Sequence, residues 1–140
     1  MKKENQFIVS PLDLLKTSQL KRAMNYLLVA LGGAFGSVLR YWTGLIFSFP
    51  FGTLTVNIFG SLAMGFAYGL LSEKGLERAG LLLMTGFLGG FTTFSAFSLD
   101  VMKLFSDERL FHGFIYIFMS FLGAIVAVWV GFLMAKGLSS

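Results

Sequence analysis

The chain has 140 residues, of which 56% are hydrophobic and only 13% charged, with a formal net charge of +4. A soluble domain uses about 25% charged residues, so the composition excludes an ordinary water-soluble protein. The chain has no cysteine, which excludes disulfide bonds and thiolate metal sites. The sequence contains no nucleophile–base set, glycine-rich phosphate loop or metal-ligand spacing, so we expect no enzyme.

The first 22 residues precede the first long apolar run. They mix leucine, isoleucine and phenylalanine with lysine and arginine. This composition predicts that residues 1–22 form an interfacial amphipathic lead-in at the membrane surface.

Four later stretches carry almost no charged residues, and each reaches the ~20 residues with which a helix crosses the hydrocarbon core. Backbone groups find no water inside a bilayer, so we expect these stretches to be helices. The sequence therefore predicts a four-helix membrane domain at 23–136 and a polar tail at 137–140. Its spans cover residues 23–47, 51–71, 79–103 and 112–135.

The distribution of lysine and arginine predicts the orientation in the membrane. The N-terminus, the loop at residues 72–78 and the C-terminus share one side, and the other side has Lys103 and Arg109. Because cytoplasmic segments carry the excess of basic residues, we expect a cytoplasmic N-terminus. These residues flank the spans instead of forming one patch, so we expect no nucleic-acid partner. The first side has five basic residues near the membrane, namely Lys21, Arg22, Lys74, Arg78 and Lys136.

Span one contains an arginine within a stripe of small residues. Gly32, Gly36, Arg40 and Gly44 follow one another at intervals of four, so they share one helix face. Such stripes let helices approach closely in lipid. An arginine there faces protein or water, or it snorkels to the headgroups from the helix end. The sequence leaves both interpretations open.

Spans two and four carry polar side chains at membrane depth. Asn57 lies one turn after Thr53 on the same face. A buried amide costs free energy unless it is hydrogen-bonded, so Asn57 either clamps two helices or offers an N–H group to an anion in a pore. Tyr116 and Ser120 share a small-residue face. That face suits helix packing, and it can also serve a polar pathway.

The segment GFLGGFTTFSAFS, residues 86–98, stands inside span three. Its glycines and threonines weaken a helix, which predicts a break in mid-membrane whose free carbonyls suit a small cation. After the break, Phe94 and Phe97 share one face, with Ser95 and Ser98 beside them. Aromatic rings have positive edges, so this face can bind a small anion. The binding would be weak, and weak binding is what an ion channel requires if the ion is to leave again. Alternatively, the phenylalanines face lipid or the core.

Three segments together resemble the CrcB/Fluc fluoride channels, and the resemblance covers about residues 23–136. It implies an all-α membrane protein that forms an antiparallel, dual-topology dimer. It also implies passive export of fluoride across the plasma membrane, which relieves fluoride toxicity. The three segments are GGAFGSVLRYW (32–42), GTLTVNIFGSLAMG (52–65) and GFLGGFTTFSAFSLD (86–100).

The resemblance also implies roles for individual residues. A structural Na⁺ at the dimer interface would be held by the backbone carbonyls of Gly89 and Thr92. Arg40 would lie in a pore vestibule or at the interface. Two positions depart from the family pattern, Ala96 in place of Ser or Thr and Asp100 in place of Glu. The fluoride pathway would contain Asn57, Phe94, Phe97, Ser95, Thr53, Tyr116 and Ser120.

Three alternatives stay open at this stage. The preferred homodimer requires one sequence inserted both ways, whereas the bias of five basic residues against two favours one orientation and a heterodimer with an oppositely oriented paralogue. A small four-helix multidrug exporter has a similar size, but it needs a carboxylate in span one, and none is present. A non-transporting accessory subunit would need no ion pathway.

Overall fold

The computed structural model describes residues 11–72 and 74–139, and this part of the chain consists of helices joined by short connections. Four helical stretches are long and apolar enough to cross a membrane. This finding confirms the prediction of an all-α, multi-pass membrane protein with four spans. The stretches are Leu12–Ile46, Phe51–Leu71, Glu77–Ser106 and Leu110–Leu138.

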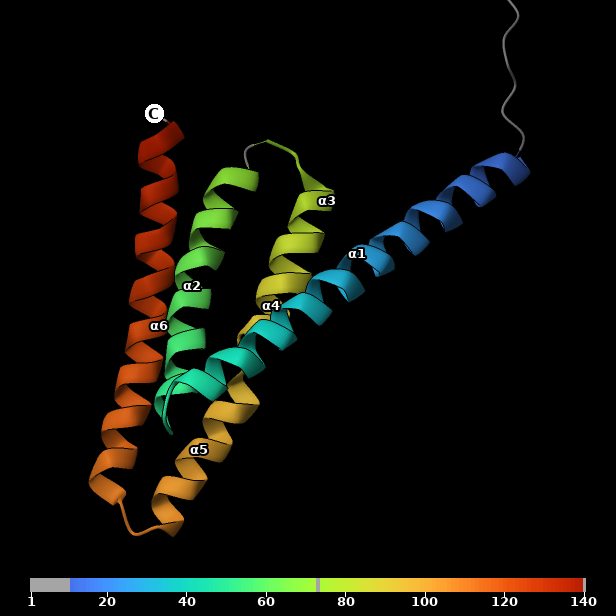
Figure 1. Ribbon diagram of the computed structural model, residues 1–140. Coiled ribbons are helices and arrows are strands. Elements are labelled where there is room, and N and C mark those ends of the chain that lie inside the picture. The colour runs from blue at the N-terminus through green and yellow to red at the C-terminus, as the bar shows by residue number, and fades with distance from the viewer. Residues whose placement is uncertain (1–10, 73, 140) are drawn as a thin grey trace, which may run out of the picture.

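The first, second and fourth spans are single helices, whereas the third is assembled from four short elements. These elements follow one another from α3 through the wider π-helix η1 and α4 to α5 (Figure 1). The helices are α1 (Pro11–Ile46), α2 (Phe51–Leu71), α3 (Glu77–Gly80), η1 (Leu81–Leu88), α4 (Gly89–Phe91), α5 (Phe94–Ser106) and α6 (Leu110–Ser139).

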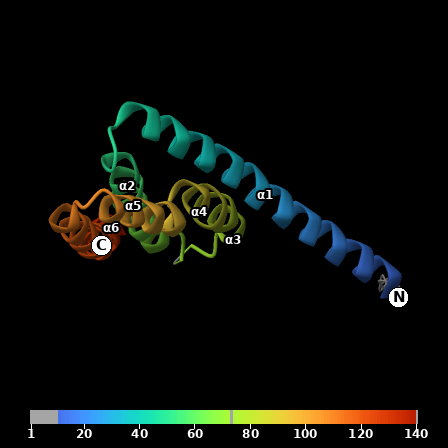
Figure 2. The ribbon, with the colours of Figure 1, turned by 90° about the horizontal axis from the view of Figure 1, so that it is seen from below.

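Helix α1 continues without interruption from the predicted lead-in into the first span. Its 36 residues correspond to about 54 Å at 1.5 Å per residue, which exceeds the ~30 Å thickness of the hydrocarbon core. Figures 1 and 2 show its N-terminal half leading away from the other helices. Residues 1–10 of the lead-in lie outside the described residues, and its interfacial position stays a prediction.

Glycines bring the helix backbones into direct contact. Helix α2 packs most extensively on α6, where a β-carbon on Gly65 would overlap the carbonyl of Val128 and one on Gly131 would overlap that of Leu62. Lipid tails are as apolar as leucine, so close van der Waals packing replaces the hydrophobic effect as the force that holds such helices together.

The glycine stripe of α1 packs over only part of its length. Gly32 and Gly36 lie against the backbone of η1 at Leu82 and Phe87, whereas a β-carbon on Gly44 would meet nothing within 4 Å. Contact with η1 and α4 therefore places α1 across the third span (Figure 2).

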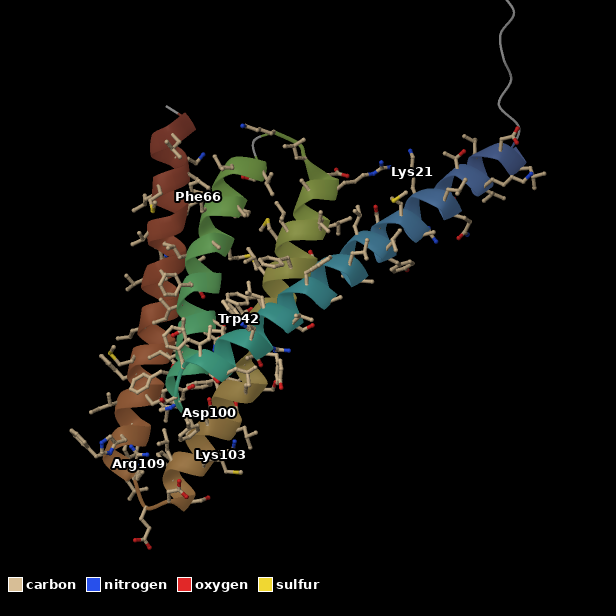
Figure 3. All side chains as sticks on the ribbon, viewed as in Figure 1. Lys21, Trp42, Phe66, Asp100, Lys103 and Arg109 are labelled. Carbon is tan, nitrogen blue, oxygen red and sulfur yellow. The ribbon has the colours of Figure 1, made fainter. Side chains whose placement is uncertain are left out.

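The two ends of the molecule differ in their basic side chains. The connection between α2 and α3 lies at the same end as the C-terminus of α6 (Figure 1). Lys21 lies toward that end, whereas Lys103 and Arg109 lie toward the opposite end (Figure 3). This arrangement agrees with the sides to which the sequence assigned them.

We expect Gly65→Ala to lower the free energy of unfolding by about 1–3 kcal/mol, because the added methyl group forces the backbones of α2 and α6 apart. Unfolding of the purified protein in mild detergent measures this change. Gly80→Ala is the matched control, since a β-carbon on Gly80 meets nothing within 4 Å. Equal stability of the two variants would contradict the packing argument.

Candidate functional site: a pocket beside a helix interruption

The helical path of the third span is interrupted at Thr92 and Thr93, between α4 and α5. Both residues are extended, with φ/ψ of −76°/154° and −154°/118°. The Thr92 N–H still donates to the Leu88 carbonyl at 3.0 Å, and the Thr92 hydroxyl donates to the same carbonyl at 2.9 Å. The Leu88 carbonyl, in the last turn before the interruption, therefore accepts two hydrogen bonds.

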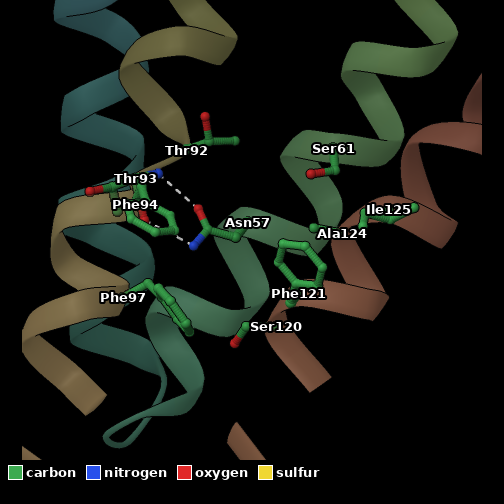
Figure 4. A pocket seen from close by; sticks show the side chains of 10 residues that line it. All are labelled: Asn57, Ser61, Thr92, Thr93, Phe94, Phe97, Ser120, Phe121, Ala124 and Ile125. Carbon is green, nitrogen blue, oxygen red and sulfur yellow. Dashed lines mark hydrogen bonds between the residues drawn. The ribbon is translucent and has the colours of Figure 1, made fainter. Parts of the chain in front are cut away.

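Asn57 of α2 bridges to this interruption through both ends of its amide. The Asn57 side-chain NH₂ donates to the Thr93 carbonyl at 3.0 Å, and the Thr93 N–H donates to Asn57 Oδ1 at 2.7 Å. In a continuous α-helix the Thr93 N–H would donate to the carbonyl of Gly89, four residues earlier. Asn57 Oδ1 thus replaces the Gly89 carbonyl as the acceptor for the Thr93 N–H (Figure 4).

Thr93 also starts the second half of the span. It is the N-cap of α5, and its hydroxyl oxygen accepts a hydrogen bond from the Ala96 N–H at 3.2 Å. The Ser95 hydroxyl lies 3.2 Å from the same oxygen. A threonine N-cap satisfies one of the free N–H groups at a helix start, so Thr93 fixes where α5 begins and which way it leaves the interruption.

A pocket of about 320 Å³ opens beside the interruption, between α2, α5 and α6. Figure 4 shows its polar and aromatic side chains converging from these elements. Its lining contains no charged side chain. The lining residues are Asn57, Ser61, Thr92, Thr93, Phe94, Phe97, Ser120, Phe121, Ala124 and Ile125.

Ser120 supplies this pocket with a free hydroxyl group. The residue is only 5% exposed, and its Oγ has no hydrogen-bond partner among the described residues. A buried polar atom without a partner costs about 1–3 kcal/mol. The hydroxyl is therefore available to donate to a ligand that enters the pocket.

Two phenylalanine rings stand at the same pocket. The ring centroids of Phe94 and Phe97 are 5.4 Å apart. Phe97 also stacks on Tyr116 of α6, with centroids 5.5 Å apart, whereas Phe94 is 75% exposed. Phe97 is held by its own chain, and Phe94 leaves most of its ring uncovered.

A buried carboxylate orients Tyr116. The Tyr116 hydroxyl donates to Asp100 Oδ2 at 3.2 Å, and the two residues are 4% and 7% exposed. The phenol has a single proton, and this proton is committed to Asp100. Asp100 is a positioning residue that the sequence patterns had not assigned.

The pocket gathers only some of the residues in the predicted fluoride pathway. Asn57, Phe94, Phe97 and Ser120 line it directly. The others lie outside its lining. Ser95 is exposed on α5, Thr53 is half-buried on α2, Tyr116 is buried on α6, and Arg40 is half-buried on α1. Gly89 is exposed in α4, while Thr92, the other predicted sodium ligand, lines the pocket.

Five further lining residues had not been predicted as site residues, namely Ser61, Thr93, Phe121, Ala124 and Ile125. Ser61 and Ala124 are small residues within the spans, a type that favours helix packing. The sequence pattern does not distinguish Phe121 and Ile125 from residues that face lipid. Only the packing of α2 and α6 beside the interruption brings the five together.

Comparison with known proteins places the chain in a family. The family model described as CrcB-like protein, Camphor Resistance (CrcB), matches residues 27–132. The chain belongs to the CrcB family. The family resemblance seen in the three sequence segments is thereby confirmed.

Several relatives of this CrcB chain bear the name fluoride-specific ion channel FluC. The one from Paracoccus denitrificans is 43% identical over 118 residues, which cover 81% of this chain and 95% of that protein. The one from Rhizobium etli is 46% identical over 120 residues, or 80% of this chain and 96% of that protein. The one from Flavobacterium psychrophilum is 39% identical over 118 residues, which cover 79% and 95% respectively.

We expect Asn57→Ala to destabilise the protein by about 2–4 kcal/mol, because both the N–H and the carbonyl of Thr93 lose their partner at the interruption. Thermal unfolding in detergent measures this loss. Asn25→Ala on α1 is the matched control, because it removes the same side chain away from the pocket. A loss no larger than that of the control would show that the amide does not support the interruption.

Proposed function

We propose that this CrcB chain is the subunit of a fluoride-selective channel that lets F⁻ leave the cytoplasm passively across the plasma membrane. Relatives that are named fluoride-specific ion channels match this chain over nearly their whole length. The chain is accordingly a transport protein and not an enzyme.

The observation that carries the proposal is the free Ser120 hydroxyl in the same pocket as Phe94 and Phe97. Fluoride is small and accepts strong hydrogen bonds. Ser120 offers one O–H group, and Asn57 retains a second amide N–H, since only one of its two protons is committed to Thr93. The positive edges of the phenylalanine rings complete a shell for an anion.

The absence of a charged side chain from the pocket lining favours conduction over tight binding. An ion must bind well enough to enter and weakly enough to leave. Hydroxyl, amide and ring-edge contacts meet both conditions, whereas a buried arginine would hold the anion. Asp100 lies nearby, but its carboxylate accepts the Tyr116 hydroxyl.

Accumulation of fluoride in the cytoplasm makes passive transport run outward. Hydrofluoric acid is a weak acid that crosses membranes in its neutral form and ionises in the less acidic cytoplasm. The trapped anion then leaves down its own gradient once a selective path exists. The pathway therefore needs no coupled ion or energy source.

The open side of the pocket supports a dimer of two oppositely oriented subunits. Phe94 leaves 75% of its surface uncovered, so a second subunit would close the pathway. In an antiparallel arrangement the two interruptions would face one another at the centre. The second subunit is either another copy of this chain or an oppositely oriented relative.

The residues at the interruption also fit a structural Na⁺. The Thr93 N–H is diverted to Asn57, which frees the Gly89 carbonyl from its helical donor, and Thr92 is extended. Backbone carbonyls at a helix break suit a small cation. Gly89 and Thr92 would hold the ion, which would supply positive charge at the centre of the dimer.

Liposomes loaded with potassium fluoride test the function. After valinomycin is added, we expect fast fluoride efflux through the purified chain and no chloride efflux from matched potassium chloride vesicles. In detergent no membrane fixes the orientation of a subunit. Two copies of this chain can therefore pair in opposite orientations before they are reconstituted. Absence of fluoride efflux, both alone and with a co-expressed oppositely oriented relative, would contradict the proposal.

We expect Ser120→Ala to slow fluoride efflux about tenfold, because one hydrogen bond to an anion is lost and such bonds contribute about 1.5–3 kcal/mol. The free energy of unfolding should not fall, since Ser120 Oγ has no partner to lose among the described residues. Ser106→Ala, at an exposed position at the end of α5, is the control. Unchanged efflux through Ser120→Ala would remove its hydroxyl from the pathway.

A further inference from the structure

Helices α2 and α6 run side by side in the same direction (Figure 1), and glycines mark the points where they touch. A contact that lies further along one helix also lies further along the other. This order fixes which residues of the two helices lie at the same level. A β-carbon on Gly123 would meet Ile58, one on Gly65 would overlap the carbonyl of Val128, and one on Gly69 would meet Ala135.

The pocket beside the interruption has two levels along this pair of helices. One turn before the contact at Gly65, Ser61 of α2 lies level with Ala124 of α6. Another turn earlier, Asn57 lies level with Ser120. Residues four apart share a helix face and differ by about 6 Å along the axis, and all of these residues line the pocket. We call the pair with Asn57 the first level and the pair with Ser61 the second level.

The Ser61 hydroxyl makes no hydrogen bond within the described part of the chain. A serine or threonine inside a helix can donate to the carbonyl four residues earlier. Figure 4 shows the Ser61 oxygen turned instead toward the side of the pocket where Asn57 and Thr92 lie. The hydroxyls that do donate in this way, at 2.6–3.0 Å, are those of Thr17, Ser37, Thr43, Ser72, Thr92 and Ser98.

The other hydroxyls of the pocket are accounted for. Thr92 donates to the Leu88 carbonyl at 2.9 Å. The Thr93 hydroxyl oxygen lies 3.2 Å from the Ser95 hydroxyl and accepts the Ala96 N–H. Among the lining residues, the hydroxyls without a hydrogen bond to a described residue are therefore those of Ser61 and Ser120.

We propose that Ser61 is a second fluoride-binding residue, which holds the ion at the second level, one helical turn from the first. This inference rests on the proposed function and adds a donor that no sequence motif indicated. A hydrogen bond to an ionised acceptor is about twice as strong as one between neutral groups, so a single hydroxyl suffices for a weak site. Because Ala124 adds no donor, the second level binds the ion less tightly than the first, where Asn57 and Ser120 can both donate.

The second level shortens the part of the pathway that offers no donor. Toward the C-terminal end of α2, a second cavity of about 320 Å³ lies between α2, η1 and α6. The next lining residue of α2 with a hydrogen-bonding side chain is Tyr68, roughly 16 Å along the helix from Asn57 but only roughly 10 Å from Ser61. An ion without donors is costly in an apolar medium, and conduction favours several weak positions. The second cavity is lined by Met64, Gly65, Tyr68, Met84, Val128, Trp129 and Phe132.

Fluoride efflux from liposomes, measured at several fluoride concentrations, tests the role of Ser61. We expect Ser61→Ala to slow efflux about tenfold at low fluoride concentration, because one hydrogen bond to the ion is lost. The unfolding temperature in detergent should not fall, since the Ser61 hydroxyl has no partner to lose among the described residues.

Two further variants separate ion binding from helix packing. Thr55→Val removes a hydroxyl from the same helix, outside the lining of both cavities, and should conduct like the unchanged chain. The double variant S61A/A124S moves the hydroxyl across the second level from α2 to α6. We expect this variant to regain most of the lost efflux, because the ion needs a donor at this level and not on a particular helix.

Efflux through Ser61→Ala that equals efflux through the unchanged chain would overturn the proposal. Slowed efflux that A124S does not restore would also overturn it, since a hydroxyl on α6 replaces a donor to the ion but not a packing contact of α2. The proposed function is tested separately by the unchanged chain. If that chain conducts no fluoride, the proposed function fails, whereas conduction that is insensitive to Ser61→Ala removes only the second level.

Discussion

The pair of hydrogen bonds between Asn57 and Thr93 is the interaction on which the site depends. An interrupted helix exposes backbone groups that a membrane interior cannot satisfy. One amide side chain satisfies an N–H and a carbonyl together and ties α2 to the third span. This contact places the start of α5, and with it Phe94 and Phe97, against the α2–α6 pair. The pocket forms because Asn57 fixes the position of the interruption relative to α2.

The two interpretations that the sequence left open for Asn57 are not exclusive. The structure shows the clamp, in which one amide proton is committed to Thr93. The amide has a second proton, which is free for the role in anion binding that we propose. A residue that serves both purposes couples the integrity of the helix interruption to the chemistry of the pocket, so substitutions at this position change both.

Hydropathy and charge patterns were sufficient to predict the four spans, because the bilayer imposes a minimum length and excludes charge. The residue types of the segment from residue 86 to 98 also led to the hypothesis of an anion path there, which stays a prediction. The partner of Asn57 could not be predicted, since it is a backbone group 36 residues away. The pairing of Asp100 with Tyr116 and the isolation of Ser120 likewise depend on how α5 and α6 cross, which periodicity does not specify.

The exposed ring of Phe94 and the unpaired hydroxyl of Ser120 also bear on the fate of a subunit that finds no partner. Acyl chains that cover the open pocket give that hydroxyl nothing to bond with, so a subunit without a partner keeps an unsatisfied polar group beside its lipid-facing surface. In the dimer that we propose, assembly would give the hydroxyl access to water and to the ion. Association of this dimer in the membrane would then be favoured by satisfying these polar groups as well as by packing.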